Sequence, residues 1–345
     1  MKILFLTHWF YPKIGGIEVN SEILADGFVK NGHEVRLVTW TEDYGDKNFA
    51  YQIIRKPGIG ELASAHLWAD VVFENNICLR LSWPAFFFRK KSVVALRSWV
   101  RRDSGQMAWQ DKLKTSWLKR ARGVIAVSKV IRDECWPGAK VIGNPYRNEL
   151  FCQLPDRTQS KGFVFLGRLV GDKGADLAIK SLAALMKSTV IKNLPWSLVL
   201  TVIGEGPEYL NLQQLAIDLG IGYCVTFKGT LTGEALVETL NEHRYMLVPS
   251  TLIEPFGNVA LEGMACGCLP IVSDGGGLPD AVGNAGLTFK RGSLDELVDT
   301  ILGLLKNPAL EEELRKQAAF HLKNHQPAMV SKKYLEVIEK AFRKN

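Results

Sequence analysis

The sequence lacks the marks of several common protein classes. No apolar run approaches the roughly 20 residues of a membrane-spanning helix, which argues against an integral membrane protein. The six cysteines form no C-x-x-C pair and accompany no histidine cluster at zinc spacing, so we expect free thiols, a reducing cytoplasm and no metal. There is also no D-x-D sequence, the obvious carboxylate pair for a metal-bridged nucleotide diphosphate. Low-complexity segments and short tandem repeats are absent as well.

Charge, in contrast, is plentiful but unevenly spread. Residues 1–155 hold 23 Lys and Arg against 15 Asp and Glu, a balance of +8, whereas the remainder holds 20 against 21, a balance of −1. The segment from Arg89 to Arg122 alone has 11 basic and two acidic residues. Such a field attracts anionic partners. We expect no nucleic-acid partner, because no recognisable binding motif accompanies the charge.

The run from Trp83 to Lys91 permits two interpretations. Its aromatic side chains and the three cations after them would suit docking on an anionic membrane, where each surface cation adds about 1 kcal/mol. Alternatively, the aromatics are helix core and the cations an ordinary solvated face.

Length and periodicity predict two α/β domains. A chain of 345 residues exceeds one ordinary compact core. Strand and helix patterns alternate from residues 2–7, which we interpret as a buried strand rather than a signal peptide, and the alternation restarts at 163–166. The polar, proline-containing segment 152–161 predicts a linker. We therefore expect two open parallel sheets covered by helices, with ligands bound beyond the carboxyl ends of the strands.

The stretch 249–286 contains the most specific pattern. Glu254 and Glu262 are separated by seven residues. Pro255 and Gly257 disfavour a helix before the sequence VALEGMAC. This predicts a loop that carries Glu254 and a short helix that carries Glu262 about one turn inside.

The start of this short helix is a candidate anion site. Asn258 is a plausible cap, and the backbone amides of Gly257 to Val259 would point out of the helix start, where the dipole favours an anion. The glycines at 275–277 follow an apolar run and allow the backbone to approach a ligand closely. The whole stretch therefore predicts a site for a polar, anionic molecule.

This stretch resembles the E-x7-E region of the family-4-type retaining glycosyltransferases, and the similarity extends over nearly the whole chain. The resemblance implies the GT-B fold, in which two Rossmann-like domains with parallel sheets face each other across a cleft. On this basis residues 1–155 form an acceptor-binding domain and 156–325 a nucleotide-sugar-binding domain. Residues 326–345 form a C-terminal helix that packs back on the first domain.

The resemblance also implies roles for individual residues. The segment FLGRLVGDKGAD is similar to the family's G-R-L-x-x-x-K-G segment, so Arg168 and Lys173 are expected to hold the donor diphosphate. Glu254 is expected at the donor sugar and, with Arg168 and Lys173, forms the predicted catalytic set. Glu262 would accept hydrogen bonds from the ribose hydroxyls. Further donor contacts are implied for Gly16, Gly204, Phe256, Gly257, Asn258 and Val259.

Two glycine-bearing loops have competing interpretations. Gly16 lies in a loop that resembles the family's first-domain glycine loop, but a tight turn alone would also account for it. Gly204 lies in VIGEGPEY, which resembles half of a dinucleotide fingerprint. Tyr209 stands in place of the third glycine, and Lys228 stands where an acidic ribose ligand is expected, so a nicotinamide site is disfavoured.

The first domain departs from the family pattern. Arg97 stands where family members commonly have a histidine that contacts the donor sugar, which makes Arg97 a candidate sugar or acceptor contact. A strand that often ends in histidines reads Val71 to Asn75, and the family's Gly-Leu-Pro-Glu has Asp280 as its carboxylate. These departures imply either an unusual sugar or acceptor, or reduced activity.

Together these features predict a retaining, metal-independent hexosyltransferase. It would move a sugar from a UDP- or GDP-sugar to a hydroxyl of a saccharide or lipid-linked acceptor in cell-envelope or exopolysaccharide synthesis. We expect it in the cytoplasm or at the inner face of the membrane, with no cofactor because the nucleotide sugar is a substrate. One alternative is a nucleotide-sugar 2-epimerase, which would need histidines at the strand ends. The other is a catalytically weak partner subunit, supported mainly by Arg97.

Overall fold

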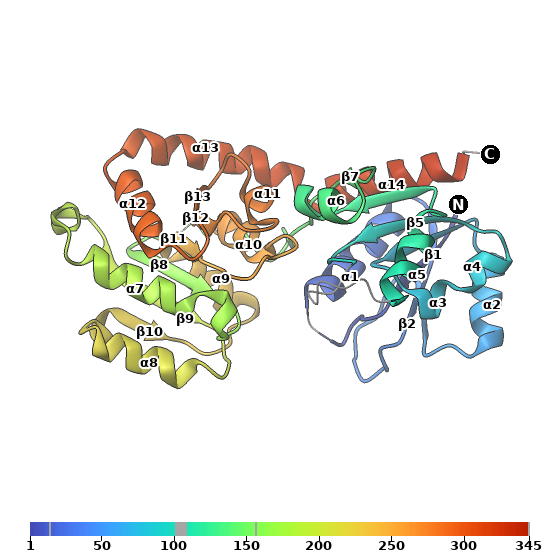
Figure 1. The fold of residues 1–345 in the computed structure, drawn as a ribbon, viewed down its shortest axis with the longest axis horizontal. Coiled ribbons are helices and arrows are strands. Elements are labelled where there is room, and N and C mark those ends of the chain that lie inside the picture. The colour runs from blue at the N-terminus through green and yellow to red at the C-terminus, as the bar shows by residue number, and fades with distance from the viewer. Residues whose placement is uncertain (14, 101–108, 156, 344–345) are drawn as a thin grey trace. The chain divides into compact units, whose positions relative to one another are not determined.

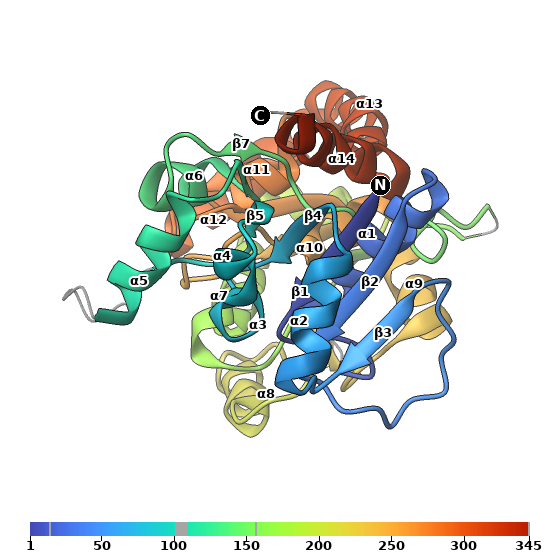
Figure 2. The same ribbon diagram turned by 90° about the vertical axis from the view of Figure 1, so that its right-hand side faces the viewer.

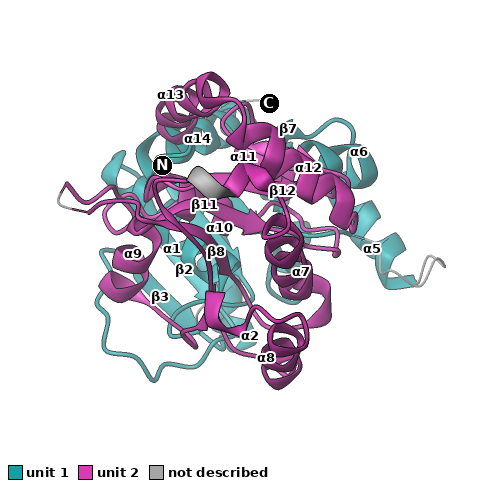
Figure 3. Ribbon diagram, turned by 90° about the vertical axis from the view of Figure 1, so that its left-hand side faces the viewer, with its two compact units in different colours: residues 1–145, 325–345 teal, residues 146–324 magenta. Residues whose placement is uncertain are grey.

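The protein is described from a computed structural model that covers every residue except 14, 101–108, 156 and 344–345 (Figure 1). Arg101, Arg102 and Asp103 of the basic segment therefore lie outside the described residues. The chain folds as two compact units, which Figure 3 colours separately. Unit 1 comprises Met1–Pro145 and His325–Asn345, and unit 2 comprises Tyr146–Asn324.

Unit 1 is built on a seven-stranded parallel sheet with the strand order β3-β2-β1-β4-β5-β6-β7 (Figure 2). Apolar strands that alternate with helices produce this arrangement, because each helix returns the chain to the start of the next parallel strand. The strands are β1 (Lys2–Thr7), β2 (Glu34–Thr39), β3 (Gln52–Arg55), β4 (Val71–Asn75), β5 (Lys91–Leu96), β6 (Gly123–Ala126) and β7 (Lys140–Val141). The helices are α1 (Gly16–Lys30), α2 (Ile59–Trp68), α3 (Leu79–Ser82), α4 (Pro84–Phe87), α5 (Trp109–Leu118), α6 (Lys129–Cys135) and α14 (Pro327–Arg343).

The sheet of unit 1 is buried on both faces. Ile3 and Phe5 of β1 belong to the apolar cluster that includes residues of α1 and α14, whereas Leu4 and Leu6 belong to the cluster that includes residues of α2 and α3. This division follows from the alternation of side chains along a strand. Phe5 and Phe73 meet edge to face, with ring centroids 4.9 Å apart, a favourable geometry for aromatic pairs.

The C-terminal helix α14 completes unit 1. It lies against α1 and β5 and buries one face that includes Val330, Tyr334 and Ile338. The crossing of α1 and α14 is close, since a Cβ atom added at Gly27 would lie 2.0 Å from the Ser331 hydroxyl oxygen. The predicted return of the last helix to the first sheet is therefore confirmed.

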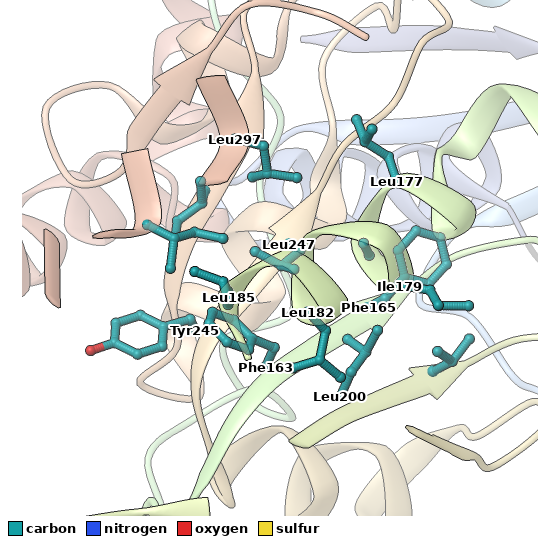
Figure 4. Packing of buried hydrophobic residues seen from close by; sticks show 14 of the residues in the cluster. Phe163, Phe165, Leu177, Ile179, Leu182, Leu185, Leu200, Tyr245, Leu247 and Leu297 are labelled. Carbon is teal, nitrogen blue, oxygen red and sulfur yellow. The ribbon is translucent and has the colours of Figure 1, made fainter. Parts of the chain in front are cut away.

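Unit 2 contains a six-stranded parallel sheet with the order β10-β9-β8-β11-β12-β13. Its strands are β8 (Lys161–Leu166), β9 (Ser197–Ile203), β10 (Val225–Phe227), β11 (His243–Val248), β12 (Leu269–Ser273) and β13 (Leu287–Phe289). Its α-helices are α7 (Ala175–Leu185), α8 (Tyr209–Asp218), α9 (Gly233–Asn241), α10 (Asn258–Ala265), α11 (Leu278–Val282), α12 (Leu294–Leu305) and α13 (Pro308–Asn324). Short 3-10 turns occupy Gly171–Lys173, Thr189–Asn193 and Gly222–Cys224. Figure 4 shows part of the core, where Phe163 and Tyr245 of the strands meet leucines of α7.

The segment after Pro145 belongs to unit 2 rather than to a free linker. The Leu154 amide donates to the side chain of Asn241 at 2.8 Å, and that side chain donates to the Cys152 carbonyl at 2.9 Å. These bonds explain why the first unit ends at Pro145, although the polar composition placed the change of domain after residue 155. At the other end, unit 2 ends at Asn324.

Candidate functional site

The sheet of unit 2 has a topological switch point between β8 and β11. From β8 the chain proceeds to β9 and β10 on one side and then returns to β11 on the other. The loops that leave β8 and β11 therefore diverge at the carboxyl edge, the place where open α/β sheets bind ligands. These loops, residues 167–174 and 249–257, contain all three residues that the sequence predicts to be catalytic.

Lys173 and Glu254 form an ion pair at this switch point. The Lys173 Nζ lies 2.9 Å from the Glu254 Oε1, and the two side chains are 21% and 13% exposed. Two residues 81 positions apart, both predicted to be catalytic, are thus in direct contact. The loops are also joined through the backbone, because the Asp172 carbonyl accepts the amides of Thr251 at 2.9 Å and Leu252 at 3.1 Å.

Two glycines allow neighbouring loops at this edge of the sheet to approach each other closely. Gly174 has a φ of +74°, and a Cβ atom there would lie 2.0 Å from the Pro249 carbonyl oxygen. Gly204, which follows β9, has a φ of +137°, and its Cβ would lie 1.9 Å from the Gly167 carbonyl oxygen. Neither position can hold a side chain without moving the backbone of the neighbouring loop.

The glycine loop after β12 approaches protein rather than open space. A Cβ atom at Gly276 would lie 2.3 Å from the Glu254 carbonyl oxygen, and one at Gly277 would lie 2.2 Å from that of Pro255. The Gly277 amide donates to the Glu254 carbonyl at 2.7 Å. The close approach that the sequence assigned to a ligand is therefore made, at these two glycines, by the backbone of the Glu254 loop, which the glycine loop supports.

Helix α10 begins at Asn258, as the sequence predicts, but Asn258 is not its cap. Gly257 precedes the helix with a φ of +113°, and no side chain caps the helix start. A side chain at Gly257 would also meet Leu278, whose Cδ2 would lie 2.4 Å from the added Cβ. The amides of the first turn, including those of Asn258 and Val259, form the positive end of the helix directly after the Glu254 loop. Phe256 is 3% exposed and anchors that loop in the core.

Glu262 lies one turn inside α10 and is half-buried. Burial raises the pKa of its carboxyl to about 6, and the Arg147 guanidinium opposes this rise. Sequence reasoning did not single out Arg147. The guanidinium of Arg147 also lies over the Phe151 ring, 5.5 Å from the centroid, and its Nε is buried without a hydrogen-bond partner among the described residues. No local signal distinguishes Arg147 from the other arginines of the chain.

Arg168 occupies the same loop as Lys173 but is exposed. Among the described side chains it has no ion-pair partner. The structure therefore brings Lys173 and Glu254 together, places Arg168 on the loop of Lys173, and places Glu262 on the helix that follows Glu254. We find none of these four turned into the packed apolar core.

Arg97 of unit 1 is buried, with 5% of its surface exposed. Its Nε donates to the Asn75 Oδ1 and its Nη1 to the Asn144 Oδ1, both at 2.6 Å, and its guanidinium lies 5.3 Å from the centroid of the Tyr334 ring. Burial lowers the pKa of Arg97. The side chain thus connects β4, the segment after β7 that carries Asn144, and α14.

Two further features of unit 1 concern the predicted contacts. Gly16 is the first residue of α1, directly after a loop that follows β1. Glu74, which stands near a strand end where the family often has histidines, is fully buried and accepts from the Cys78 amide at 3.0 Å and the Trp117 Nε1 at 2.7 Å. Burial raises the pKa of Glu74 to about 7.

Within the described residues, no group of three or more His, Cys, Asp or Glu side chains is placed to hold a metal ion. In the same residues, no helix combines the length and the apolar character needed to cross a bilayer.

Comparison with protein families identifies the chain. The family model described as "Glycosyl transferases group 1" matches residues 147–320, just over half of the sequence. The chain belongs to the group 1 glycosyl transferases. The predicted transferase class is therefore confirmed.

Two relatives of known class have low sequence identity to this chain. An uncharacterized glycosyltransferase of Methanocaldococcus jannaschii, MJ1607, is 25% identical over 338 residues, which cover 82% of this chain and 83% of the relative. The D-inositol 3-phosphate glycosyltransferase of Corynebacterium jeikeium is 33% identical over 190 residues, 53% of this chain and 42% of that protein.

Solved structures extend the likeness to the complete fold. Anabaena Alr3699/HepE, solved in complex with UDP, matches 98% of this group 1 transferase and 100% of its own chain, with a TM-score of 0.79 and 18% identity. WaaG, a glycosyltransferase involved in lipopolysaccharide biosynthesis, matches 97% of this chain and 99% of its own, with a TM-score of 0.67 and 18% identity. The fold is thus GT-B, as the family resemblance implies.

Proposed function

We propose that this glycosyltransferase is a retaining, metal-independent hexosyltransferase that uses a UDP- or GDP-sugar. The observation that supports this most directly is the Lys173–Glu254 contact at the β8/β11 switch point. It sets a cation and a carboxylate side by side at the edge where a parallel sheet binds its ligand. Anabaena Alr3699/HepE, of similar fold, has been solved with UDP-glucose, which supports a donor of this class.

The donor diphosphate is the charged group that this site must stabilise. When the anomeric bond breaks, negative charge develops on the leaving phosphate, and positioned cations and amides lower the barrier most when they are already in place. Lys173 uses one of its three ammonium hydrogens on Glu254 and retains two for phosphate oxygens. Arg168 adds an exposed guanidinium, which suits bidentate phosphate contacts, and the first turn of α10 adds its amides.

Glu254 positions the donor in this scheme. It fixes the Lys173 ammonium through one oxygen, and its second oxygen is available for a sugar hydroxyl. The leaving phosphate, rather than Glu254, would help remove the proton of the acceptor hydroxyl, and attack on the same face of the sugar retains its configuration.

Glu262 is proposed to hold the ribose. A carboxylate has two oxygens and can accept both vicinal hydroxyls. The Arg147 guanidinium favours the ionised form that this role needs. Gly16 and Gly204 complete the proposed donor contacts from their loops.

Unit 1 is proposed to bind the acceptor, a saccharide or a lipid-linked molecule of cell-envelope or exopolysaccharide synthesis. The proposed location is the cytoplasm or the inner face of the membrane, and the positive balance of residues 1–155 supports an anionic partner. Arg97 is proposed to support this site through Asn75 and Asn144 rather than by direct contact alone, since two of its nitrogens are already bonded.

A second candidate is a catalytically weak partner subunit that binds nucleotide sugar for another transferase. The internal bonding of Arg97 favours it, because the histidine expected to contact the donor sugar has no evident replacement there.

A screen of nucleotide sugars separates the two candidates. Thermal-shift assays identify the donor, since a ligand at a hundred times its dissociation constant stabilises by about 2.7 kcal/mol. Release of nucleoside diphosphate is then followed with a panel of saccharide and lipid-linked acceptors. Acceptor-dependent release supports the transferase. Donor binding without release or transfer would assign the chain to the partner-subunit role, and no stabilisation by any nucleotide sugar would contradict both.

A further inference from the structure

Unit 1 has a strongly basic hollow at the amino edge of its sheet. The hollow has a volume of about 220 Å³ and is lined by residues of α4, of α5 and of the segments that lead into β5 and β6. Five of its nine lining residues are Lys or Arg and none is acidic: Arg89, Lys90, Lys91, Arg120 and Arg122. Lys91 is the first residue of β5, and Arg122 immediately precedes β6. The hollow therefore lies at the opposite edge of the sheet from Asn75 and Arg97.

Three cations of this basic hollow are held by neutral groups. The Lys90 Nζ donates to the carbonyls of Leu67 at 3.1 Å and Ala69 at 2.7 Å, and the Lys91 Nζ donates to that of Phe342 at 2.6 Å. The Arg120 guanidinium lies over the Phe86 ring, 4.0 Å from its centroid. Carbonyls and a ring fix Lys90, Lys91 and Arg120 in place, and none of these three forms an ion pair within the described part of the chain. A fixed group of cations around a hollow attracts an anion.

Exposed aromatic rings stand beside the basic hollow. Trp83, Phe86 and Phe87 are 38%, 48% and 68% exposed, although such large apolar side chains are normally covered. The ring centroids of Phe86 and Phe87 lie 5.3 Å apart, and those of Trp83 and Phe87 lie 5.7 Å apart, both edge to face. Leu67 of α2 is 59% exposed, and its carbonyl accepts a hydrogen bond from Lys90. Its side chain therefore adds apolar surface near the hollow. Aromatic rings next to cations are the side chains that proteins place at the boundary of a bilayer.

The arrangement of the rings distinguishes a membrane from a nucleic acid. Proteins that bind single strands present flat ring faces on which bases stack. Here the planes of the neighbouring rings are inclined by 78° and 81°, and Arg120 covers a face of Phe86. This compact apolar cluster suits insertion between lipid headgroups rather than base stacking.

We propose that the basic hollow binds the phosphate of an anionic phospholipid headgroup while Trp83, Phe86 and Phe87 enter the interfacial layer of the bilayer. The hollow has room for a phosphate group with several waters, given that a water occupies about 30 Å³ in the liquid. The proposal gives a defined binding site to the membrane contact that the charge balance suggests. It does not depend on the donor chemistry proposed above, because the site and its test involve no nucleotide sugar.

Vesicle flotation of the full-length protein tests this site. Wild-type protein is expected to float with vesicles of 70% phosphatidylcholine and 30% phosphatidylglycerol, but not with phosphatidylcholine alone. Binding is expected to fall in 0.5 M NaCl, which shortens the Debye length to about 4 Å. Arg89→Gln/Arg120→Gln is expected to weaken binding about thirtyfold, because each cation near such a surface contributes roughly a factor of five.

Matched variants separate binding at this site from nonspecific effects of net charge and of exposed apolar side chains. Lys187→Gln/Lys306→Gln removes the same charge from exposed positions of unit 2 and should leave vesicle binding unchanged. Phe87→Ser should weaken binding about fivefold, whereas Leu210→Ser, at an apolar side chain that is 74% exposed, should not. Unchanged melting temperatures show that the variants fold.

Several results would overturn the proposal. Equal flotation with neutral and anionic vesicles would exclude headgroup recognition, and equal losses in the two double variants would reduce the effect to net charge. Binding of a 20-nucleotide single strand that requires Arg89 and Arg120, without vesicle binding, would assign the hollow to nucleic acid. Binding of inorganic phosphate alone through the same arginines, again without vesicle binding, would assign it to a soluble anion.

Discussion

The Lys173–Glu254 pair makes a sharp prediction about coupling. Exposed ion pairs contribute about 0.2–1 kcal/mol, whereas breaking a buried pair costs about 3–5 kcal/mol. At 2.9 Å and with side chains 21% and 13% exposed, this pair lies between these limits. We expect a coupling energy of about 1–2 kcal/mol in the ligand-free protein, measured by urea unfolding of Lys173→Ala, Glu254→Gln and the double variant.

Nucleotide binding should change this coupling. If the Lys173 ammonium also contacts the diphosphate, its interaction with Glu254 weakens. The coupling energy measured with saturating UDP should therefore fall. In turnover, Lys173→Ala should lose on the order of a hundredfold or more, the usual loss when a group that stabilises a developing charge is removed.

The pair Lys180–Asp176 on α7 provides the control. Its ions are 2.8 Å apart but its side chains are 41% and 42% exposed. We expect a coupling of no more than about 0.5 kcal/mol and unchanged turnover in Lys180→Ala. Wild-type turnover in Lys173→Ala, or a Lys173–Glu254 coupling no larger than the control, would refute the reasoning.

Three further predictions concern other parts of the protein. Because the pKa of Glu262 is raised to about 6 when folded, the protein should lose stability, up to about 2 kcal/mol, as pH rises from 4.5 through 6; Glu262→Gln should abolish this loss in urea titrations while weakening nucleotide affinity, and an unchanged pH profile would contradict the assignment. Arg97→Ala should destabilise by about 3 kcal/mol, because it removes the charged hydrogen-bond donors of two buried amide oxygens, and a cost under 1 kcal/mol in urea unfolding would show that Arg97 is not structural. Activity should survive EDTA in assays of released nucleoside diphosphate, and its loss, restored by a divalent cation, would reveal a metal requirement.

The alternation of strands and helices was predictable because its signals are local. The parallel sheets follow from apolar runs bounded by glycine and polar turns. Strand β1 occupies its predicted range, and β8 begins two residues before its predicted start at Phe163. Short elements were missed. Strand β3 (Gln52–Arg55) and strand β13 (Leu287–Phe289) have too few residues to show a period, and only pairing with neighbouring strands defines them.

The site residues of unit 2 were predicted through resemblance, but their contacts were not. Nothing local to Lys173 indicates a carboxylate 81 positions away, and the contact exists because β8 and β11 are neighbours in the sheet. The glycines after β12 show the same limit. Their sequence predicts a close approach, yet it does not say that the partner is the backbone of Glu254 and Pro255.

The burial of Arg97 was also beyond the sequence. An arginine at a strand end is usually exposed, and here three distant residues, Asn75, Asn144 and Tyr334, provide its surroundings. Arg147 escaped notice for a similar reason, since its proximity to Glu262 depends on the fold of unit 2.

The central claim is that the carboxyl edge of the unit 2 sheet, at β8 and β11, binds a nucleotide sugar. Isothermal titration of UDP-glucose, or of the donor found in the screen, into wild type, Lys173→Ala, Glu262→Ala and the control Lys180→Ala tests it most directly. Both site variants should bind at least tenfold more weakly than wild type, and the control should bind equally well. Wild-type affinity in both site variants would contradict the account.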